Sequence, residues 1–221
     1  MNLALYAHPF SSYSQKALIA LYENATPFEL KMLGPESPEN FEALKQRWPL
    51  GKFPLLDDDG VVVFEATSII EYLALHHPCP VPLIPEDRKI ALGVRMMDRV
   101  FDNYVMSPMQ RIVADRLRPP EQRDSQTVTE ARSMLDAIYR WLDRRMTGRE
   151  WAAGEAFSLA DCAAAPALFY ADWAHPIIDE FGELNAYRNR LMARPSVARV
   201  VDEARPYRHF FPLGAYPRAD G

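Results

Sequence analysis

Cysteine is scarce in this chain, and its scarcity excludes several kinds of chemistry. The 221 residues contain only Cys79 and Cys162, which lie far apart and form no recognisable redox or metal-binding pair. So few thiolates exclude a zinc or iron–sulfur centre of the usual cysteine-rich kind. We therefore expect no metal site and a reducing, cytoplasmic environment.

Long apolar runs and strongly basic runs are also missing. No stretch reaches the length of a membrane-spanning helix. The first residues, Met1–Asn2–Leu3, lack the basic and then apolar layout of a signal peptide. The formal net charge of −5 offers no broad attraction for nucleic acid or an anionic membrane. Neither is an expected partner.

Strand and helix patterns alternate over the first third of the chain. The predicted strands cover 3–7, 28–32, 53–56 and 61–64, and helical spacing follows the first, second and fourth of them. The acidic, glycine-ended segment 57–60 predicts a hairpin between the last two strands. The order β-α-β-α-β-β-α predicts an α/β domain that ends by residue 77.

Proline marks the end of this domain. Four prolines in the nine residues 77–85 predict a stiff, extended linker. Beyond it the strand patterns stop, and helical patterns cover 87–116, 122–146, 159–172, 179–193 and 196–204. Pro108 should kink or divide the first of these helices. The predicted organisation is an α/β domain at 1–77, a linker at 78–86 and an all-helical domain at 87–221.

The first segment that carries chemistry, residues 5–16, joins the first strand to the first helix and contains Phe10–Ser11–Ser12–Tyr13–Ser14. A helix N-terminus favours an anion, including a thiolate, and a serine hydroxyl there donates a hydrogen bond to sulfur. The alternative is that one of these serines only caps the helix, because serine is strongly favoured at that position.

The second segment is Gly51–Lys52–Phe53–Pro54. Proline cannot donate to a strand ladder and belongs at an edge or a special turn. If the bond before Pro54 is cis, the backbone N–H and C=O of Phe53 face outward and pair with a peptide-like ligand. The alternative is an edge-strand proline with no ligand.

The third segment is Glu65–Ala66–Thr67 at the start of another helix. The Glu65 carboxylate suits an ammonium group, and the backbone N–H groups of Ala66 and Thr67 suit a carboxylate. Together they suit both charges of an α-amino acid. In the alternative interpretation, Glu65 complements the helix dipole and Thr67 caps the helix.

In order and spacing, these three segments resemble the cytosolic glutathione transferase superfamily. Residues 157–162 and 194–197 extend the resemblance over nearly the whole chain. It implies a thioredoxin-like N-terminal domain followed by an all-helical domain, and conjugation of glutathione to small electrophiles. It also implies glutathione as cosubstrate without a further cofactor, and a symmetric homodimer.

The resemblance assigns a role to each motif residue. Ser11 matches the serine that activates the glutathione thiol in the serine-type classes, and Tyr6 is the alternative because the tyrosine-type classes use the end of the first strand. Phe53, before a cis Pro54, pairs with the cysteinyl backbone. Glu65 binds the γ-glutamyl end, where the helix start at Ala66 and Thr67 lies, and Lys52 assists near the glycyl carboxylate.

The family's acceptor pocket lies between the two domains and is lined partly by the first long helix. The candidate residues in this sequence are Phe10, Tyr13, Tyr104, Met106 and Arg111. Helical spacing of aromatic and methionine residues is also typical of a core, so a structural role is the alternative.

Two positions depart from the family's pattern. Ala66 stands where a serine usually donates to the γ-glutamyl carboxylate, and Tyr13 stands where isomerase-like relatives carry cysteine. The first departure keeps open a non-catalytic ligand-binding or partner-binding module. A glutathione-dependent peroxidase, lyase or dehalogenase on the same scaffold is a further alternative.

In the second domain, Ser158–Leu159–Ala160–Asp161 has the spacing of a capping box with aspartate in place of glutamate. We expect Asp161 to start a helix rather than to take part in catalysis.

Overall fold

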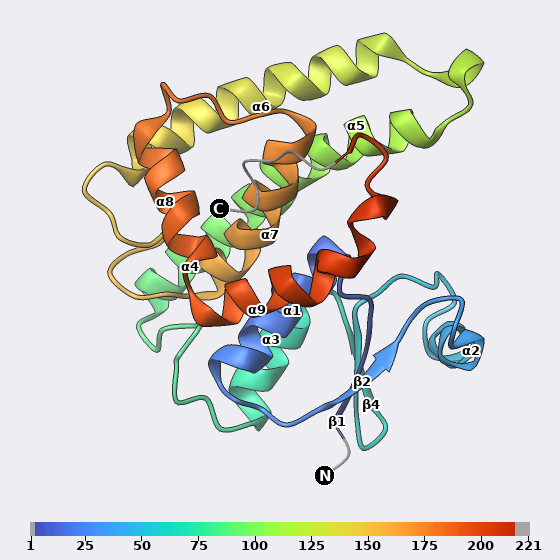
Figure 1. The fold of residues 1–221 in the computed structure, drawn as a ribbon. Coiled ribbons are helices and arrows are strands. Elements are labelled where there is room, and N and C mark those ends of the chain that lie inside the picture. Colours follow the sequence, from blue (N-terminus) through green and yellow to red (C-terminus); the bar gives the residue numbers. More distant parts are fainter. Residues whose placement is uncertain (1–2, 215–221) are drawn as a thin grey trace.

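The computed structural model describes residues 3–214 and places a small sheet with its helices beside a larger set of helices (Figure 1). The strands are β1 (Leu3–Ala7), β2 (Glu29–Met32), β3 (Leu55–Asp58) and β4 (Val61–Phe64), in the order β2-β1-β3-β4. β1 is parallel to β2, whereas β3 runs antiparallel to β1 and β4. The mixed sheet followed by helices confirms the predicted fold class.

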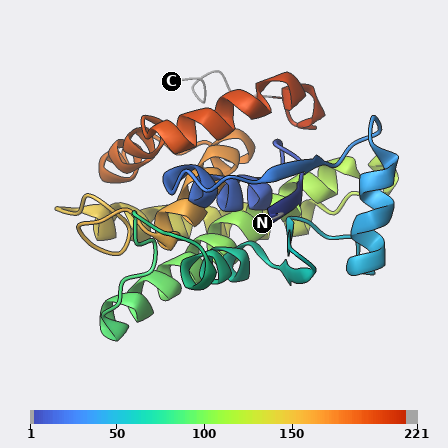
Figure 2. The same cartoon turned by 90° about the horizontal axis from the view of Figure 1, so that it is seen from below.

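The two faces of the sheet carry different helices because alternate side chains of a strand point to opposite sides. Leu5 and Ala7 belong to the core with α1 (Ser12–Glu23) and α3 (Ala66–His76). Tyr6 instead packs with Leu44 of α2 (Pro38–Arg47) in a smaller cluster. α2 accordingly stands apart from α1 and α3 in both ribbon views (Figures 1 and 2).

The predicted hairpin forms between β3 and β4, with a turn shorter than the segment 57–60. Asp58 pairs with Val61, so only Asp59 and Gly60 make the turn. Both have positive φ angles, 48° and 94°, which suit the twist of a two-residue hairpin. The strand continues to Asp58 because ladder pairing outweighs the turn preference of aspartate.

The segment 77–87 separates α3 from α4 (Arg88–Val100) and contains neither helix nor strand. The predicted linker 78–86 falls within this segment. α4 begins after Asp87, whose carboxylate accepts hydrogen bonds from the backbone N–H groups of Lys89 and Ile90 at 2.8 and 3.0 Å. The first long helix therefore has a well-capped start.

Pro108 divides the first long helix, as predicted, through a wider turn. A π-helical segment, η1 (Phe101–Met106), lies between α4 and α5 (Ser107–Leu117), and Pro108 is in the first turn of α5. The backbone N–H of Ser107 bonds to the carbonyl of Asp102, five residues back. Proline has no N–H and its ring crowds the carbonyl four residues earlier, and the wider turn relieves that crowding.

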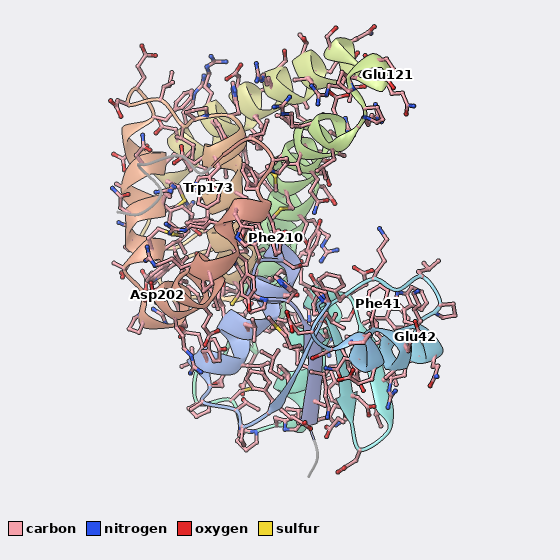
Figure 3. All side chains as sticks on the ribbon, turned by 45° about the vertical axis from the view of Figure 1, so that its right-hand side comes forward. Phe41, Glu42, Glu121, Trp173, Asp202 and Phe210 are labelled. Atoms are coloured by element: carbon pink, nitrogen blue, oxygen red, sulfur yellow. The ribbon has the colours of Figure 1, made fainter. Side chains whose placement is uncertain are left out.

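Four further helices complete the bundle among the described residues. They are α6 (Ser125–Met146), α7 (Leu159–Ala174), α8 (Gly182–Met192) and α9 (Pro195–Ala204), with short 3₁₀ turns at η2 (Pro120–Gln122) and η3 (Arg205–Phe210). Every residue of α7 is buried, and α7 packs against α1, α4, η1 and α8. η3 brings Phe210 to the junction between the helices and the N-terminal domain (Figure 3).

Asp161 has the structural role that its sequence position predicts. Its Oδ2 accepts hydrogen bonds from the backbone N–H and the hydroxyl of Ser158 at 2.9 and 3.0 Å. Its Oδ1 also accepts from Ala152 N–H at 2.9 Å and from the Tyr187 hydroxyl at 2.6 Å. Asp161 therefore joins the start of α7 to a preceding loop and to α8, which is more than a capping box requires.

Candidate functional site

Ser11 caps α1 and keeps a hydroxyl proton to donate. Its Oγ accepts a hydrogen bond from the backbone N–H of Ser14 at 3.3 Å, so the capping interpretation is confirmed. A hydroxyl oxygen accepts with its lone pairs and donates with its hydrogen. Capping and donation to a sulfur atom at the positive end of α1 are therefore compatible.

The peptide bond between Phe53 and Pro54 is cis, as the second segment required for ligand pairing. Within residues 3–214, the backbone N–H and C=O of Phe53 form no hydrogen bond, because β3 begins only at Leu55. These two groups are free to pair with the backbone of a peptide-like ligand.

The start of α3 is also open. Glu65 precedes the helix with a φ angle of 69°, a sparsely populated region for a residue with a side chain, and its carboxylate forms no cap bond. Such a conformation costs about 1–3 kcal/mol and is concentrated at functional sites. No acceptor in the described part of the chain bonds to the N–H groups of Ala66 and Thr67. This helix start can bind a carboxylate.

Two adjacent cavities collect the residues of the three segments. The first, of about 230 Å³, is lined by the predicted glutathione-binding residues other than Thr67, with further walls from Trp48 and Phe64. Those predicted residues are Lys52, Phe53, Pro54, Glu65 and Ala66. The second, also about 230 Å³, includes Ser11 in its wall. Tyr13 and Gln110 line both cavities and mark the junction between them.

The second cavity is mainly apolar and aromatic. Phe10 and Tyr170 form one part of its wall, and their rings meet edge to face with centroids 5.4 Å apart. Phe210 and Phe211, from the C-terminal turn, form another part. Such a wall suits an apolar electrophile whose reactive atom faces the junction.

Tyr13 at the junction is a hydrogen-bond donor throughout the physiological pH range. Burial raises the pKa of Tyr13 to about 12, and the negative charges of Asp102 and Glu65 act in the same direction. The phenol therefore stays protonated, which suits donation to an anion and excludes a role as a base near neutral pH.

The predicted acceptor residues divide into two groups. Phe10 and Tyr13 line the second cavity. Tyr104 and Arg111 are exposed and Met106 is buried in the core, and none of the three lines either cavity. The walls instead use Met109, Gln110, Val113 and Leu117 of α5. These lining residues recur along one face of α5, whereas Tyr104 and Met106 belong to η1 and Arg111 lies on another face of α5.

A buried ionic cluster behind the start of α3 had no signal in the sequence. The Lys16 ammonium lies 2.6 Å from Oδ1 of Asp98 and 2.6 Å from Oδ2 of Asp102, and it donates to Thr67 Oγ1 at 2.9 Å. Arg99 also bonds to Asp98 and Thr67. Burial raises the pKa of Asp102, whereas the Lys16 charge opposes that rise. The cluster joins α1, α3, α4 and η1.

A larger groove, of about 600 Å³, lies between the α1–β2 loop and the segment after α3. Leu3, Phe28 and His77 are among its lining residues, and none of the three chemical segments reaches it. Chemistry rather than volume identifies the functional site, so we assign it to the two cavities above.

Clusters of metal-binding side chains and helices that could span a membrane are both absent from the described residues. In the range 3–214 there is no cluster of three or more histidine, cysteine, aspartate or glutamate side chains arranged to hold a metal ion. None of the helices in that range is sufficiently long and apolar to cross a membrane.

The mixed sheet, the cis proline and the open start of α3 define a thioredoxin-like domain coupled to a helical domain. The models of two family domains match the chain: the N-terminal domain of glutathione S-transferase over residues 5–81 and its C-terminal domain over residues 105–195. The chain belongs to the cytosolic glutathione S-transferase superfamily.

Individual relatives support this membership over most of their length. The chain is 28% identical over 204 residues to glutathione S-transferase GstB of Escherichia coli K12, covering 90% of this chain and 97% of that protein. A Methylobacillus flagellatus glutathione S-transferase, solved with GSH bound, is 25% identical with a TM-score of 0.80, over 90% of this chain and 98% of its own. A Methylobacterium radiotolerans glutathione S-transferase, solved with glutathione sulfonate, is 28% identical with a TM-score of 0.77. The match covers 91% of this chain and 95% of that protein.

Proposed function

We propose that this protein is a glutathione transferase that joins the glutathione thiolate to small electrophiles. The observation that carries the proposal is the adjacency of two cavities. One collects the residues expected to hold glutathione, the other has Ser11 in its wall, and Tyr13 and Gln110 belong to both.

The first cavity offers a partner to each part of glutathione. The backbone of Phe53 pairs with the cysteinyl residue, and Lys52 faces the glycyl carboxylate. Glu65 takes the γ-glutamyl ammonium group, while the N–H groups at the start of α3 take the γ-glutamyl carboxylate. This arrangement directs the thiol toward the junction of the cavities.

Thiol activation is assigned to Ser11 and the N-terminus of α1. A free thiol has a pKa near 8.5, and a hydrogen bond to the thiolate lowers that pKa toward neutral. The thiolate then attacks the electrophile in the second cavity: the S–C bond forms while the leaving group departs with its electron pair. The position of Tyr6 supports Ser11, because Tyr6 packs toward α2 and lines neither cavity.

The assay is a titration of the protein with glutathione by calorimetry, followed by a conjugation assay with an apolar aromatic electrophile. Binding together with turnover is the expected result. S-methylglutathione is the matched control, since it fills the same cavity but has no thiol to ionise. Absence of glutathione binding would contradict the proposal.

Ala66 is the observation that favours a second candidate, a glutathione-binding module without catalysis. Alanine removes one hydroxyl donor from the γ-glutamyl end. Binding of glutathione without conjugation, and without peroxidase, lyase or dehalogenase activity on matching substrates, would support that candidate instead.

We also infer a homodimer, from exposed apolar side chains on α3 and α4. Side-chain bonds link the two helices, from Arg95 to Glu71 at 2.7 Å and from Arg99 to Thr67. Leu75 of α3 and Leu92 of α4 are 79% and 69% exposed. A second copy would bury them.

Light scattering tests the dimer. The wild-type protein should have twice the mass of the chain at micromolar concentration, and Leu92→Glu should shift it to the monomer. Leu117→Glu is the matched control, because Leu117 is equally exposed but lies at the end of α5. A monomeric wild type would contradict the inference.

A further inference from the structure

The loop that presents Ser11, residues 8–11, has two carbonyl groups whose partners are side chains rather than backbone. Within the loop, Ser11 N–H donates to the His8 carbonyl at 2.9 Å, and Phe10 N–H donates to Nδ1 of His8 at 3.1 Å. The carbonyls of Pro9 and Phe10 point instead to groups outside the loop.

The side chains of Gln15 and Tyr170 donate hydrogen bonds to these two carbonyl oxygens. Nε2 of Gln15 donates to the Pro9 carbonyl at 2.9 Å, and the Tyr170 hydroxyl donates to the Phe10 carbonyl at 2.9 Å. Nε2 of Gln15 also donates to the Tyr170 hydroxyl at 3.0 Å. The amide thus uses both of its hydrogens, and the phenol accepts one bond and donates one.

The two side chains come from different domains and are both buried. Gln15 lies on α1 with 1% of its surface exposed, and Tyr170 lies on α7 with 3% exposed. Burial raises the pKa of Tyr170, so its hydroxyl keeps its proton. The Phe10 ring packs against the Tyr170 ring, which adds a second contact between the loop and α7. The helical domain therefore helps to position the loop, through the contacts of Tyr170 with Phe10.

We propose that Tyr170 and Gln15 are positioning residues that hold the Ser11 hydroxyl at the junction of the two cavities. The proposal rests on the proposed function, in which Ser11 donates to the glutathione thiolate. A hydrogen bond weakens steeply with distance and angle, so a small shift of the loop weakens that donation. Neither side chain needs to touch the thiol to affect it.

Tyr170→Phe tests the hydroxyl alone, because the ring remains against Phe10. The readout is the apparent pKa of the bound glutathione thiol, followed by the ultraviolet absorbance of the thiolate without any acceptor. We expect this pKa to rise by about half to one unit, and kcat near pH 6.5 to fall about three- to tenfold. The dissociation constant for glutathione should stay unchanged, because the first cavity is intact.

Tyr139→Phe is the matched control. Its hydroxyl also donates to a backbone carbonyl, that of His175 at 3.1 Å, and its side chain is also buried. It lies on α6, away from the loop and from both cavities. We expect it to lower the melting temperature about as much as Tyr170→Phe and to leave the thiol pKa unchanged.

Gln15→Met provides a second route to the same result, since it keeps the side-chain length and removes both donors. Because the two residues act through one network, the double variant should lose little more than the more impaired single variant. Equal thiol pKa values in wild type, Tyr170→Phe and Gln15→Met would overturn the positioning role.

Ser11→Ala in the same assay separates the two proposals. A raised thiol pKa in Ser11→Ala but not in Tyr170→Phe or Gln15→Met overturns only the positioning role. A wild-type thiol pKa in Ser11→Ala overturns the proposed thiol activation, and the positioning role falls with it. A raised thiol pKa in all three variants, with the Tyr139→Phe value unchanged, supports both.

Discussion

Thr67 donates its hydroxyl proton to Oδ2 of Asp98 across 2.9 Å. The hydroxyl has one hydrogen, and a carboxylate can only accept, so the direction of this bond is settled. Lys16 and Arg99 donate to the same hydroxyl oxygen. The Thr67 side chain is therefore committed to the ionic cluster and has no hydrogen left for a γ-glutamyl carboxylate.

Ala66→Ser should tighten glutathione binding about tenfold. A well-aligned hydroxyl donor to a charged acceptor contributes about 1.5–3 kcal/mol, and the neighbouring Thr67 does not supply one. Calorimetric titration measures the dissociation constant. The matched variant Thr67→Val should lose stability through the cluster. If Thr67→Val weakens binding and Ala66→Ser does not improve it, the Thr67 hydroxyl already donates to glutathione. The interpretation that this hydroxyl is reserved for Asp98 would then be wrong.

Ser11→Ala should lower kcat about ten- to a hundredfold and change glutathione affinity much less, because the hydroxyl mainly stabilises the thiolate. The substitution also removes the cap on Ser14 N–H, which costs about 1 kcal/mol of stability. Steady-state kinetics and thermal unfolding measure the two effects separately.

Two companion variants isolate the effect on chemistry. Asp87→Ala removes the cap of α4 and should lower stability by a similar amount with normal turnover. Tyr6→Phe should also keep turnover, because Tyr6 packs toward α2. A large loss of kcat in Tyr6→Phe together with normal kcat in Ser11→Ala would reverse the assignment of the activating hydroxyl.

Asp161→Ala should lower the free energy of unfolding by about 3 kcal/mol or more. The buried donors Ser158 N–H, Ala152 N–H and Tyr187 O–H all lose their acceptor, and each unsatisfied donor costs about 1–3 kcal/mol. Urea unfolding measures the loss. Asp136→Ala is the control, since its carboxylate is exposed and its partner is the His175 ring. Normal stability with impaired turnover in Asp161→Ala would contradict the structural role.

Lys16→Met should lower the free energy of unfolding by about 3–5 kcal/mol. Methionine fits the space of the lysine side chain, but Asp98 and Asp102 are left as buried carboxylates without their main counter-charge. Lys31→Met, which breaks an exposed pair with Glu29, is the control and should have little effect. The predicted difference is measured by urea unfolding near pH 7. Equal stability of the two variants would show that the cluster is not a structural requirement.

His8 should make the protein less stable as the pH falls. Burial lowers the pKa of His8 below its usual value of 6.5, so the native state holds it neutral while the unfolded state gains a proton first. Stability is therefore lost as the pH falls from about 6.5 through the lowered pKa. The proton would also break the bond from Phe10 N–H to Nδ1.

The variant His8→Asn tests this, because its amide oxygen keeps an acceptor for Phe10 N–H without a titrating group. Unfolding measured at about pH 7 and about pH 5.5 should show a smaller loss in His8→Asn than in wild type. An equal loss in both would assign the acid sensitivity to other groups.

The features that the sequence determined on its own are those in which cause and effect lie within a few residues. The Asp59–Gly60 turn follows from residues that tolerate positive φ. The Ser158–Asp161 cap follows from a three-residue spacing, and the break before Pro108 follows from a missing N–H. The residues proposed to bind glutathione were identified by the resemblance of three ordered motifs to a family.

The walls of the second cavity were decided only by tertiary structure. These walls use one face of α5, which includes Gln110 but not Arg111, and they use no residue of η1, where Tyr104 and Met106 lie. The C-terminal turn added Phe210 from the other end of the chain. Helical periodicity groups residues into faces, but it does not say which face borders a cavity, and it does not register a later segment that folds back.

The same limit applies to the polar contacts inside the protein. Lys16 meets Thr67 across 51 residues, and Gln15 meets Tyr170 across 155. A buried charge or amide requires a partner, but that requirement does not say which distant segment provides it. The local sequence thus supplied the motifs on which the proposed glutathione site rests, whereas the packing of α1 against α3, η1 and α7 decided which side chains support them.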